Sequence, residues 1–417
     1  MRILAITFGT EGDWRPLTAL CGGLQSAGHD VLLLAPAPAA DLAARLGVRF
    51  EALAGDMARE LEAAMPMLTR RGGNAAALAR VFSGLAVRNI GEWTRAMMRH
   101  GDEVDAILCA GLAIYVGLSC AEALDKPVIG AGLQPVMPTG AFASPFLPPL
   151  RLPAWANRVS HRLVLAMLWK AFRGSINRAR REITGQAPRR DAWTGYPCLF
   201  GISPTLVAPP ADWPPHYLIT GEWRTPDDPD WQPDAALRAF LTAGEPPVYV
   251  GFGSMLGFDP AALTRVVVDA LGGRRALLFM GAAGLGAGAL PASVLRIGPL
   301  PHGWLFPRVR LVVHHGGAGT THAAAHAGKP SVVVPFAGDQ PFWAERARRL
   351  GIAPAPIRQR ALDAAVLAQR IDEALGASFA ERAAAIGRAM AHEHGVARGV
   401  AAFAQLAARP GRADGAG

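Results

Sequence analysis

Short apolar runs alternate with longer helical stretches through the first half of the chain. Runs of the length of a strand occur at 2–7, 31–35, 106–109 and 128–130, and the stretch 17–28 is a helix pattern that ends in glycine. The segments between the runs suit the right-handed crossovers that join parallel strands. The pattern predicts an α/β fold, in which helices cover a parallel sheet.

A second alternation of the same kind begins at Val248, after a proline-rich stretch with the composition of an interdomain linker. The chain has 417 residues, more than the roughly 250–300 at which a single hydrophobic core stops growing, and 51% hydrophobic residues provide for two cores. The sequence therefore predicts two parallel-sheet domains. The expected boundaries are 1–215 for the N-terminal domain, 216–235 for the linker, 236–395 for the C-terminal domain, and 396–417 for a terminal helix and tail that packs back on the N-terminal domain.

An apolar strand pattern at 309–313 runs into a loop with three glycines, and a helix opens at Thr320. Gly316, Gly317 and Gly319 let the backbone pass close to an anion. The free N–H groups at the start of the helix and the positive end of its dipole favour a diphosphate without a metal ion. The pattern predicts a phosphate-binding site at this turn.

A further strand pattern at 331–335 is followed by the polar pair Asp339 and Gln340. In an open parallel sheet, ligands lie outside the carboxyl ends of the strands, so this pair and the glycine loop are expected to share one ligand. The alternative for Asp339 is structural: it would cap the helix that starts at Pro341.

The block 309–347 resembles the donor-binding signature of the GT-B nucleotide-sugar glycosyltransferases, in the UDP-glycosyltransferase family and most closely in its sterol, glycopeptide and macrolide branch. Three other segments match the same family in the same order, namely FGTEGDWRPL at 8–17, GFGSM at 251–255 and PHGWLFPRV at 301–309. The resemblance covers nearly the whole chain. It implies the GT-B fold, with two Rossmann-like parallel-sheet domains facing a central cleft, the first binding the acceptor and the second the nucleotide-sugar donor.

The resemblance also implies donor-binding roles for particular residues. His315 is favoured over His314 as a diphosphate ligand, because side chains alternate along a strand and His314 continues the strand. Plant members of the family carry a ribose-binding Glu at the position of Ala323, so this chain departs from their ribose contact. The implied donor residues are Ser254, His315, Gly317, Ala318, Gly319 and Thr320 for the diphosphate, Trp304 for the base, and Asp339 and Gln340 for the sugar.

Asp13 is the residue expected to start the chemistry. It lies in the first glycine loop, between the strand at 2–7 and a helix expected to start at 16–17, which places it at the top of the N-terminal sheet facing the cleft. Glycosyl transfer to a hydroxyl needs a base within hydrogen-bond reach, and the resembling branch uses this aspartate as its proposed base. The alternatives are that Asp13 only caps the following helix, or that Glu11 is the base.

An apolar, ring-bearing alcohol is the favoured acceptor, because pockets for such ligands are mostly apolar, and the sterol-branch resemblance indicates the same class. We therefore expect an inverting, metal-independent transfer of a hexose, glucose by preference, from a UDP-sugar to a hydroxyl of a sterol, polyphenol, polyketide or glycolipid. The alternatives are an antibiotic glycosyltransferase that uses a TDP-sugar, a sugar-nucleotide epimerase or hydrolase, and a non-catalytic protein that binds nucleotide sugars. Candidate residues of the acceptor pocket, which would serve equally as core residues, are Met137, Phe142, Phe146 and Trp169.

No metal ion or other cofactor is expected. His322 and His326 have the i, i+4 spacing of a metal pair, but no Glu follows His322 as it would in a hydrolytic metal site. Asp228 and Asp230 imitate the D-x-D pattern of metal-dependent glycosyltransferases, but no strand pattern leads into them. Both pairs are interpreted as structural.

The positive charge of the chain, +9 in total, is concentrated in one segment. Residues 151–190 hold ten Lys and Arg against the single acid Glu182, and they include an apolar run at 163–169. A basic amphipathic helix of this kind can lie on an anionic membrane surface; the alternative is a core helix with solvated ends. Nucleic acid is not an expected partner, because the segment matches no nucleic-acid-binding module.

The location expected for the chain is the cytoplasm, with peripheral contact at the inner face of the membrane through 151–190. The N-terminal run is too short for a signal peptide, and no stretch reaches the roughly 18 apolar residues of a spanning helix. Scattered cysteines without C-x-x-C spacing indicate reduced, structural residues, namely Cys21, Cys109, Cys120 and Cys198.

Overall fold

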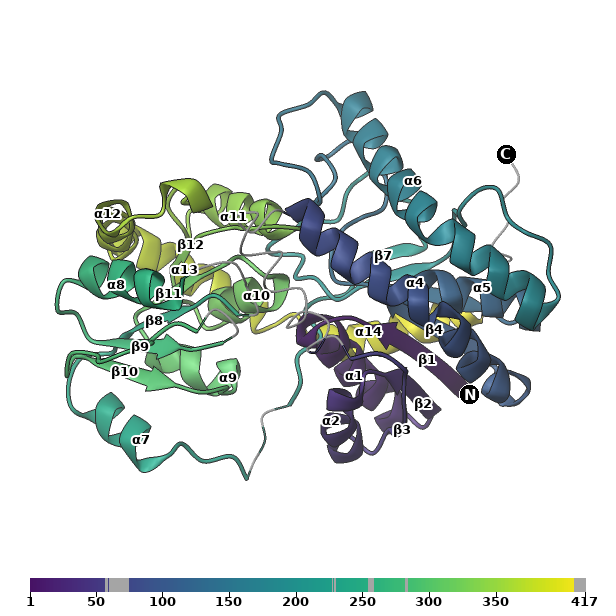
Figure 1. Ribbon diagram of the computed structural model, residues 1–417, viewed down its shortest axis with the longest axis horizontal. Helices are drawn as coiled ribbons and strands as arrows, with labels where there is room; N and C mark the ends of the chain where they lie inside the picture. Colours follow the sequence, from purple (N-terminus) through teal and green to yellow (C-terminus); the bar gives the residue numbers. More distant parts are fainter. Residues whose placement is uncertain are drawn as a thin grey trace.

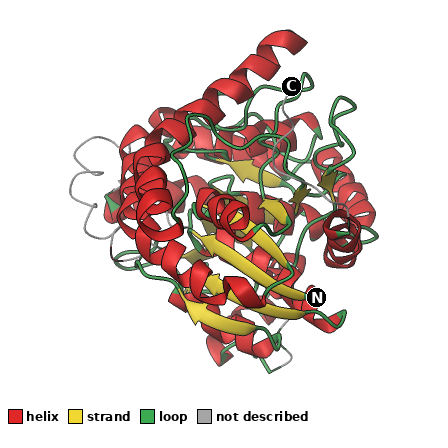
Figure 2. Ribbon diagram, turned by 90° about the vertical axis from the view of Figure 1, so that its right-hand side faces the viewer, coloured by secondary structure: helices red, strands yellow, loops and turns green. Residues whose placement is uncertain are grey.

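The computed structural model describes residues 1–56, 59, 75–226, 228, 230–253, 259–281 and 284–408, with the backbone alone at 75–82. Two parallel sheets with covering helices lie next to each other (Figure 1). From the side, the strands of the first sheet run through the middle of the domain, between layers of helices (Figure 2). The prediction of two Rossmann-like parallel-sheet domains is therefore confirmed.

The first sheet has seven parallel strands in the order β3-β2-β1-β4-β5-β6-β7. All four strands predicted from the apolar runs are present, each one or two residues longer than predicted. The other three strands have three or four residues, too few to give a periodic pattern in the sequence. The strands are β1 Arg2–Phe8, β2 Asp30–Ala35, β3 Arg49–Ala52, β4 Ala106–Gly111, β5 Val128–Gly132, β6 Cys198–Phe200 and β7 Tyr217–Ile219.

The second sheet has five parallel strands in the order β10-β9-β8-β11-β12. Its three inner strands are buried along their length, as expected of a sheet covered on both faces, with Phe279 at the end of β9 half-buried. The strands are β8 Val248–Gly251, β9 Ala276–Phe279, β10 Val294–Ile297, β11 Leu311–His314 and β12 Ser331–Val333.

Helices connect the strands of both sheets. None of them, within the residues that the structure describes, is both long and apolar enough to cross a bilayer. Their bounds are α1 Glu11–Ser26, α2 Ala40–Arg45, α4 Ala75–His100, α5 Ile114–Leu124, α6 Ala154–Ala179, α7 Ala235–Thr242, α8 Pro260–Leu271, α9 His302–Leu305, α10 Ala318–His326, α11 Gln340–Arg349, α12 Ala364–Ala374, α13 Ala377–Met390 and α14 Gly395–Ala407.

The first helix begins earlier than the sequence indicated. Helix α1 starts at Glu11 and contains Pro16, whereas a start at 16–17 was expected; that prediction is wrong. Thr10 is the N-cap residue, and its reciprocal hydrogen bonds with Asp13 form a capping box. These bonds fix the start of the helix and offset the backbone hydrogen bond that Pro16 cannot donate. Asp13 thus lies in the first helical turn.

The last helix, α14, returns to the first domain and packs on α1. Glycines allow the two helices to come close, since a Cβ on Gly23 would lie 2.4 Å from Val396 Cγ1 and one on Gly399 would lie 2.9 Å from Leu20 Cδ1. Phe403 is fully buried in the core cluster between α1, α14 and the first sheet. The C-terminal segment therefore completes one face of the N-terminal domain.

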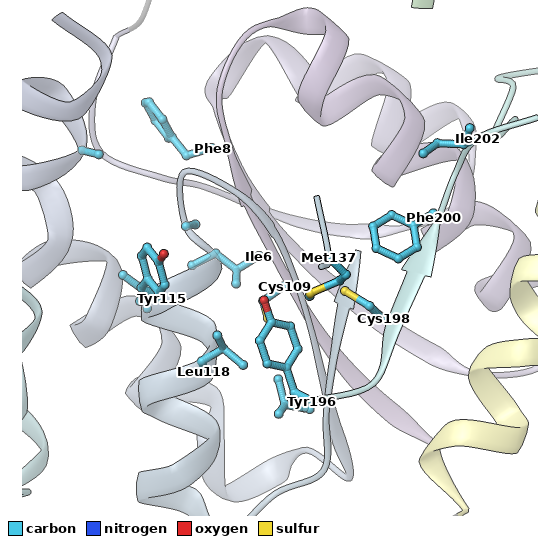
Figure 3. Packing of buried hydrophobic residues seen from close by; sticks show 14 of the residues in the cluster. Ile6, Phe8, Cys109, Tyr115, Leu118, Met137, Tyr196, Cys198, Phe200 and Ile202 are labelled. Atoms are coloured by element: carbon cyan, nitrogen blue, oxygen red, sulfur yellow. The ribbon is translucent and has the colours of Figure 1, made fainter. Parts of the chain in front are cut away.

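A second core cluster fills the opposite face of the first sheet, under α4, α5 and α6. Met137 lies among its buried residues, which include Cys109 and Cys198 (Figure 3). All four cysteines are free and buried, and burial raises the pKa of the Cys21 and Cys120 thiols to about 12. They are packing residues.

Phe403→Ala should lower the free energy of unfolding by about 3–5 kcal/mol, because it removes a fully buried ring and leaves a cavity between α1 and α14. Gln405→Ala, on the exposed side of the same helix, is the control and should change it by less than about 0.5 kcal/mol. Urea unfolding measures both. Equal stability of the two variants would contradict the packing of α14 on the first domain.

Candidate active site

The strand order of each sheet reverses at one point, between β1 and β4 in the first sheet and between β8 and β11 in the second. Ligands of open parallel sheets bind outside the carboxyl ends of the strands at such points. Asp13 follows β1 after a short turn, and His315 directly follows β11. The predicted base and the predicted diphosphate ligand thus both lie where ligands of this fold class bind.

Asp13 is held by the residue that precedes the helix. Its Oδ2 accepts hydrogen bonds from the Thr10 backbone N–H at 2.7 Å and from the Thr10 hydroxyl at 3.0 Å. A Cβ on Gly9 would lie 2.3 Å from the same oxygen, so the carboxylate occupies space that only glycine leaves open. The hydrogen bonds that cap the helix also hold the Asp13 carboxylate in a fixed position. Capping and a functional role are therefore compatible.

Burial raises the pKa of the Asp13 carboxyl from 3.8 to about 6, against the opposing effect of the Thr10 hydrogen bonds. The charge of Asp339 raises it further. The Asp13 side chain is half-buried. It keeps some contact with solvent, but the surrounding protein displaces much of its water. The group is mostly ionised at neutral pH and titrates near the pH range in which a general base works best.

Asp339 reaches the cleft from the second domain. Although it is the N-cap residue of α11, its side chain does not cap that helix; Oδ2 instead accepts from Trp343 Nε1 at 2.7 Å. Burial raises the pKa of the Asp339 carboxyl, and a hydrogen bond with Gln134 opposes that rise. Because Gln134 follows β5 of the first sheet, this carboxylate links the two domains.

Gln340 shapes the loop beside the glycine turn. Its Oε1 accepts from the backbone N–H groups of Phe336 at 2.8 Å and Ala337 at 3.1 Å. A Cβ on Gly316 would lie 3.1 Å from the Gln340 carbonyl oxygen, and φ is +88° at this glycine. The structure therefore brings the glycine loop and the Asp339–Gln340 pair together, as expected of parts that share a ligand.

The start of α10 is open. Gly317 is its N-cap residue, and no side chain among the described residues caps the helix. A Cβ on Gly319 would meet nothing within 4 Å. The N–H groups of the first turn therefore have no capping side chain within the described residues, and together with the positive end of the helix dipole they are suitable for an anion.

His315 lies between the two loops of the second domain. A Cβ on Gly253 would lie 2.8 Å from its Cε1, and one on Gly317 would lie 2.6 Å from its Nε2. Its Nδ1 is buried and has no hydrogen-bond partner in the part of the chain that the structure describes. Burial lowers the pKa of His315 to about 4, with a smaller effect from His302, so the ring is neutral at pH 7. His314 is fully buried, as strand alternation predicts.

Ser254, which was expected to bind the diphosphate, lies outside the described residues. The Trp304 ring lies 4.8 Å from that of Trp231, and the Arg308 guanidinium lies 4.3 Å from its centre. Ala323, where plant relatives carry Glu, is half-buried in the apolar cluster to which Trp304 also belongs.

The four candidate acceptor residues do not form one pocket. Met137 and Trp169 are 4% and 5% exposed and lie in the core cluster under α4, α5 and α6. Phe146 is exposed. Phe142 alone lines a crevice against α11, where it contacts Phe342 at 5.4 Å between ring centres; the crevice has a volume of about 30 Å³, room for a few water molecules only.

His322, His326 and Asp228, whose spacing resembles that of metal ligands, are bonded to protein groups. His322 Nδ1 is 2.7 Å from the Ala318 carbonyl oxygen, and its Nε2 accepts from the Ser203 N–H at 3.2 Å. His326 contacts Arg224, and Asp228 pairs with Arg45. Within the described ranges, no three His, Cys, Asp or Glu side chains are grouped to hold a metal ion.

Two interdomain contacts were not predicted from the sequence. Gln134 bonds Asp339, and Ser203 bonds both His322 and, through its hydroxyl, Glu393 Oε1 at 2.7 Å. Gln134 is a polar residue just beyond the carboxyl end of β5, a position that could have marked it. Ser203 follows a strand too short to be predicted, and its interdomain partners lie more than a hundred residues away.

Several known proteins are similar in sequence to this chain. Residues 277–397 match the family described as Erythromycin biosynthesis protein CIII-like, C-terminal domain. The chain is 33% identical to O-mycaminosyltylonolide 6-deoxyallosyltransferase of Streptomyces fradiae over 410 residues, 95% of each chain. It is 32% identical to sterol 3-beta-glucosyltransferases of Arabidopsis thaliana and Penicillium rubens, over 97% of this chain but only 65% and 30% of those enzymes.

Solved structures share the fold. The glycosyltransferase of kitacinnamycin superposes with a TM-score of 0.68 at 20% identity, covering 97% of this chain and 98% of that one. The glycosyltransferase VinC, solved in complex with dTDP, gives 0.65 at 18% identity, covering 98% and 99%. The two sheets are thus those of the GT-B fold. Because its 33% identity to a glycosyltransferase extends over nearly the whole of both chains, this protein is itself a glycosyltransferase and belongs to the UDP-glycosyltransferase family of the GT-B fold.

Proposed function

We propose that the protein transfers a hexose, with glucose as the preferred sugar, from a UDP-sugar to a hydroxyl of a lipophilic small molecule, with inversion at the anomeric carbon and without a metal ion. The observation that carries the proposal is the approach of two desolvated carboxylates, Asp13 and Asp339, from different domains, next to the open start of α10. One relative acts on O-mycaminosyltylonolide and others on sterols, which supports a lipophilic acceptor.

Asp13 is the proposed base. Thr10 holds Oδ2 in place, and Oδ1 is the oxygen proposed to take the proton of the acceptor hydroxyl. The acceptor oxygen bonds the anomeric carbon as the bond to the diphosphate breaks, and attack from the face opposite the diphosphate inverts that carbon. With a pKa of about 6, the carboxyl is ionised at pH 7 yet remains a better proton acceptor than an ordinary aspartate.

The start of α10 and His315 are proposed to stabilise the leaving diphosphate. The amides of Gly317, Ala318, Gly319 and Thr320 supply donors, and the helix dipole supplies partial positive charge. Neutral His315 can donate one hydrogen bond through a ring N–H, and the approach of the phosphates would favour its protonation. Ser254 is proposed to assist from the opposite loop. This set of donors can replace a cation.

The remaining residues are proposed to position the substrates. Asp339 and Gln340 would bind the sugar hydroxyls, because Gln340 adjoins the glycine turn and Asp339 is close enough to Asp13 to raise its pKa. Trp304 is proposed to lie beside the base. Phe142 is kept as the acceptor candidate, since among the four it alone contacts the second domain, through Phe342. The alternative donor is a TDP-sugar, since the structural neighbour VinC was solved in complex with dTDP.

Incubation with UDP-glucose or TDP-glucose and a panel of sterols, macrolides, polyphenols and glycolipids, followed by mass spectrometry, tests the function. A product heavier by one hexose, formed also in EDTA, is expected with UDP-glucose. Asp13→Asn should reduce product formation by roughly 10²–10⁴-fold while leaving UDP affinity within a few-fold. Loss of activity on chelation would contradict the metal-free mechanism, and product from TDP-glucose alone would reassign the donor.

Glu11→Gln is the matched control for this experiment. It removes a carboxylate from the same helical turn, where Glu11 pairs with Arg15 in an exposed position. Activity should persist in this variant. If Glu11→Gln were inactive and Asp13→Asn active, Glu11 and not Asp13 would be the base.

Asp13→Asn should raise the melting temperature at pH 7.5 by roughly a few degrees. The folded-state pKa of Asp13 lies above its unfolded value, so the ionised group destabilises the fold above about pH 6, and this penalty disappears as the pH falls toward 4. The gain should therefore shrink over that range. Asp105→Asn is the control of opposite sign, since the Arg2 N–H lowers the pKa of Asp105. A gain that does not depend on pH would contradict this explanation.

His315→Ala should weaken UDP binding by roughly 10–100-fold, the effect of losing a hydrogen bond to a charged group. Wild-type protein should also take up more protons than this variant when it binds UDP at pH 6, because the phosphates raise the pKa of His315 from about 4. Calorimetry in buffers of different ionisation enthalpy measures both quantities. The exposed His392→Ala is the control; equal proton uptake by all three proteins would remove His315 from the diphosphate site.

A further inference from the structure

Helix α6 carries an apolar stripe on its outer face. Trp155, Val159, Leu163 and Met167 follow one another at i, i+4 spacing and are 68%, 50%, 55% and 63% exposed. The helix lies at the outside of the first domain, and its N-terminal end projects beyond the neighbouring elements (Figure 1). Large apolar side chains gathered in this way on one surface mark an interaction site.

A core helix with solvated ends, the alternative to a membrane-binding helix, would explain only the inner face of α6. Trp169, Phe172 and Ile176 are at most 5% exposed and pack into the core on the inner face. Of the apolar run 163–169, only Trp169 is buried. The outer stripe is therefore additional to the residues that the core needs.

The stripe continues into the loop that precedes α6. Phe146 and Leu150 are 39% and 48% exposed. The same loop reaches the second domain, where Phe142 contacts Phe342 and the Arg346 guanidinium lies 4.7 Å from the centre of the Phe142 ring. Exposed apolar side chains therefore occur both on α6 and in the preceding loop that contacts the second domain.

Basic side chains border the stripe. Arg162 lies beside it on the helix, and Lys170 and Arg173 are exposed beyond its end. Together with Arg151 they have no ion-pair partner within the described residues, whereas Arg158 pairs with Asp212 and Arg180 with Glu122. The only acid in 151–190 is Glu182. The surface is therefore both apolar and strongly positive.

We propose that the outer face of α6, with the loop before it, binds the surface of an anionic lipid bilayer. An amphipathic helix with apolar and basic residues on its exposed face lies in the plane of the interface, where its apolar side chains enter the acyl boundary and its cations meet the headgroups. A second copy of the chain fits this face less well. An isologous contact would oppose like charges from the two basic borders, without acids to neutralise them.

Docking in this orientation places the cleft-side loop against the bilayer. If the acceptor is lipophilic, as the proposed function states, it can pass from the bilayer to the cleft without crossing water. This consequence rests on the proposed function. The membrane contact itself does not, so it is tested without donor or acceptor.

Co-sedimentation of the purified full chain with vesicles tests the proposal. The protein should bind vesicles of equal parts phosphatidylcholine and phosphatidylglycerol, should bind pure phosphatidylcholine much less, and should be released by high salt. Leu163→Glu/Met167→Glu and Arg162→Glu/Lys170→Glu should each lower the vesicle partition coefficient by at least about tenfold, since each basic residue near an anionic surface contributes measurably. All four positions are exposed, so the variants should fold, which circular dichroism checks.

Arg388→Glu/Arg398→Glu is the control, because it changes the net charge equally at exposed positions outside α6. It should bind vesicles like the wild type. Quenching of Trp155 fluorescence by brominated lipid, seen as the difference between wild type and Trp155→Phe, gives an independent readout. No binding to anionic vesicles, or binding unaffected by the α6 variants, would overturn the proposal. Self-association that the α6 variants abolish, without vesicle binding, would instead assign this face to a second copy.

Discussion

The site depends on the removal of water from groups that prefer to be charged. Burial raises the pKa of the Asp13 and Asp339 carboxyls and lowers that of His315, so each ionised form is less stable in the cleft than in water. The unliganded protein carries this cost. In the proposed reaction, Asp13 would lose its unfavourable charge by taking the hydroxyl proton, and the phosphates would stabilise a charge on His315. Both changes would favour the transition state over the unliganded protein.

Polar groups withdrawn from water also join the two domains. The Ser203 N–H donates to His322 of α10, and the Ser203 hydroxyl donates to buried Glu393 before α14. The helix whose start is the proposed diphosphate site is therefore bonded directly to the first domain. Burial raises the pKa of Glu222, in the linking segment, to about 7, and the charge of Glu393 adds to that rise. Polar groups withdrawn from water thus make these interdomain contacts, and one of them bonds α10 directly.

The sequence predicted those parts of this arrangement that depend on local patterns. Apolar runs identified four of the five inner strands of the first sheet, and glycines before Thr320 identified the turn that leads into α10. The start of α1 was missed because Pro16 is typical of a first helical turn, while the capping box uses Asp13 where Glu or Gln is usual. The position of Gln134 after β5 could have marked it as a site residue, but its partner and those of Ser203 in the second domain could not be predicted, because the packing of the two domains sets them. The sequence could not show whether Met137 and Trp169 line a pocket or pack in the core, since apolar side chains serve in both places.

Helix α6 illustrates why composition alone leaves such questions open. Its apolar residues divide between two faces, one packed under Trp169 and Phe172 and one exposed from Trp155 to Met167. A helix that is apolar only toward its core would be fully accounted for by the fold. Because exposed apolar area costs about 25 cal/mol per Å² relative to burial, a partner that covers the outer stripe would gain free energy that the fold itself does not use. The cations at its border select an anionic partner for that contact, and a bilayer supplies both the apolar phase and the negative charge.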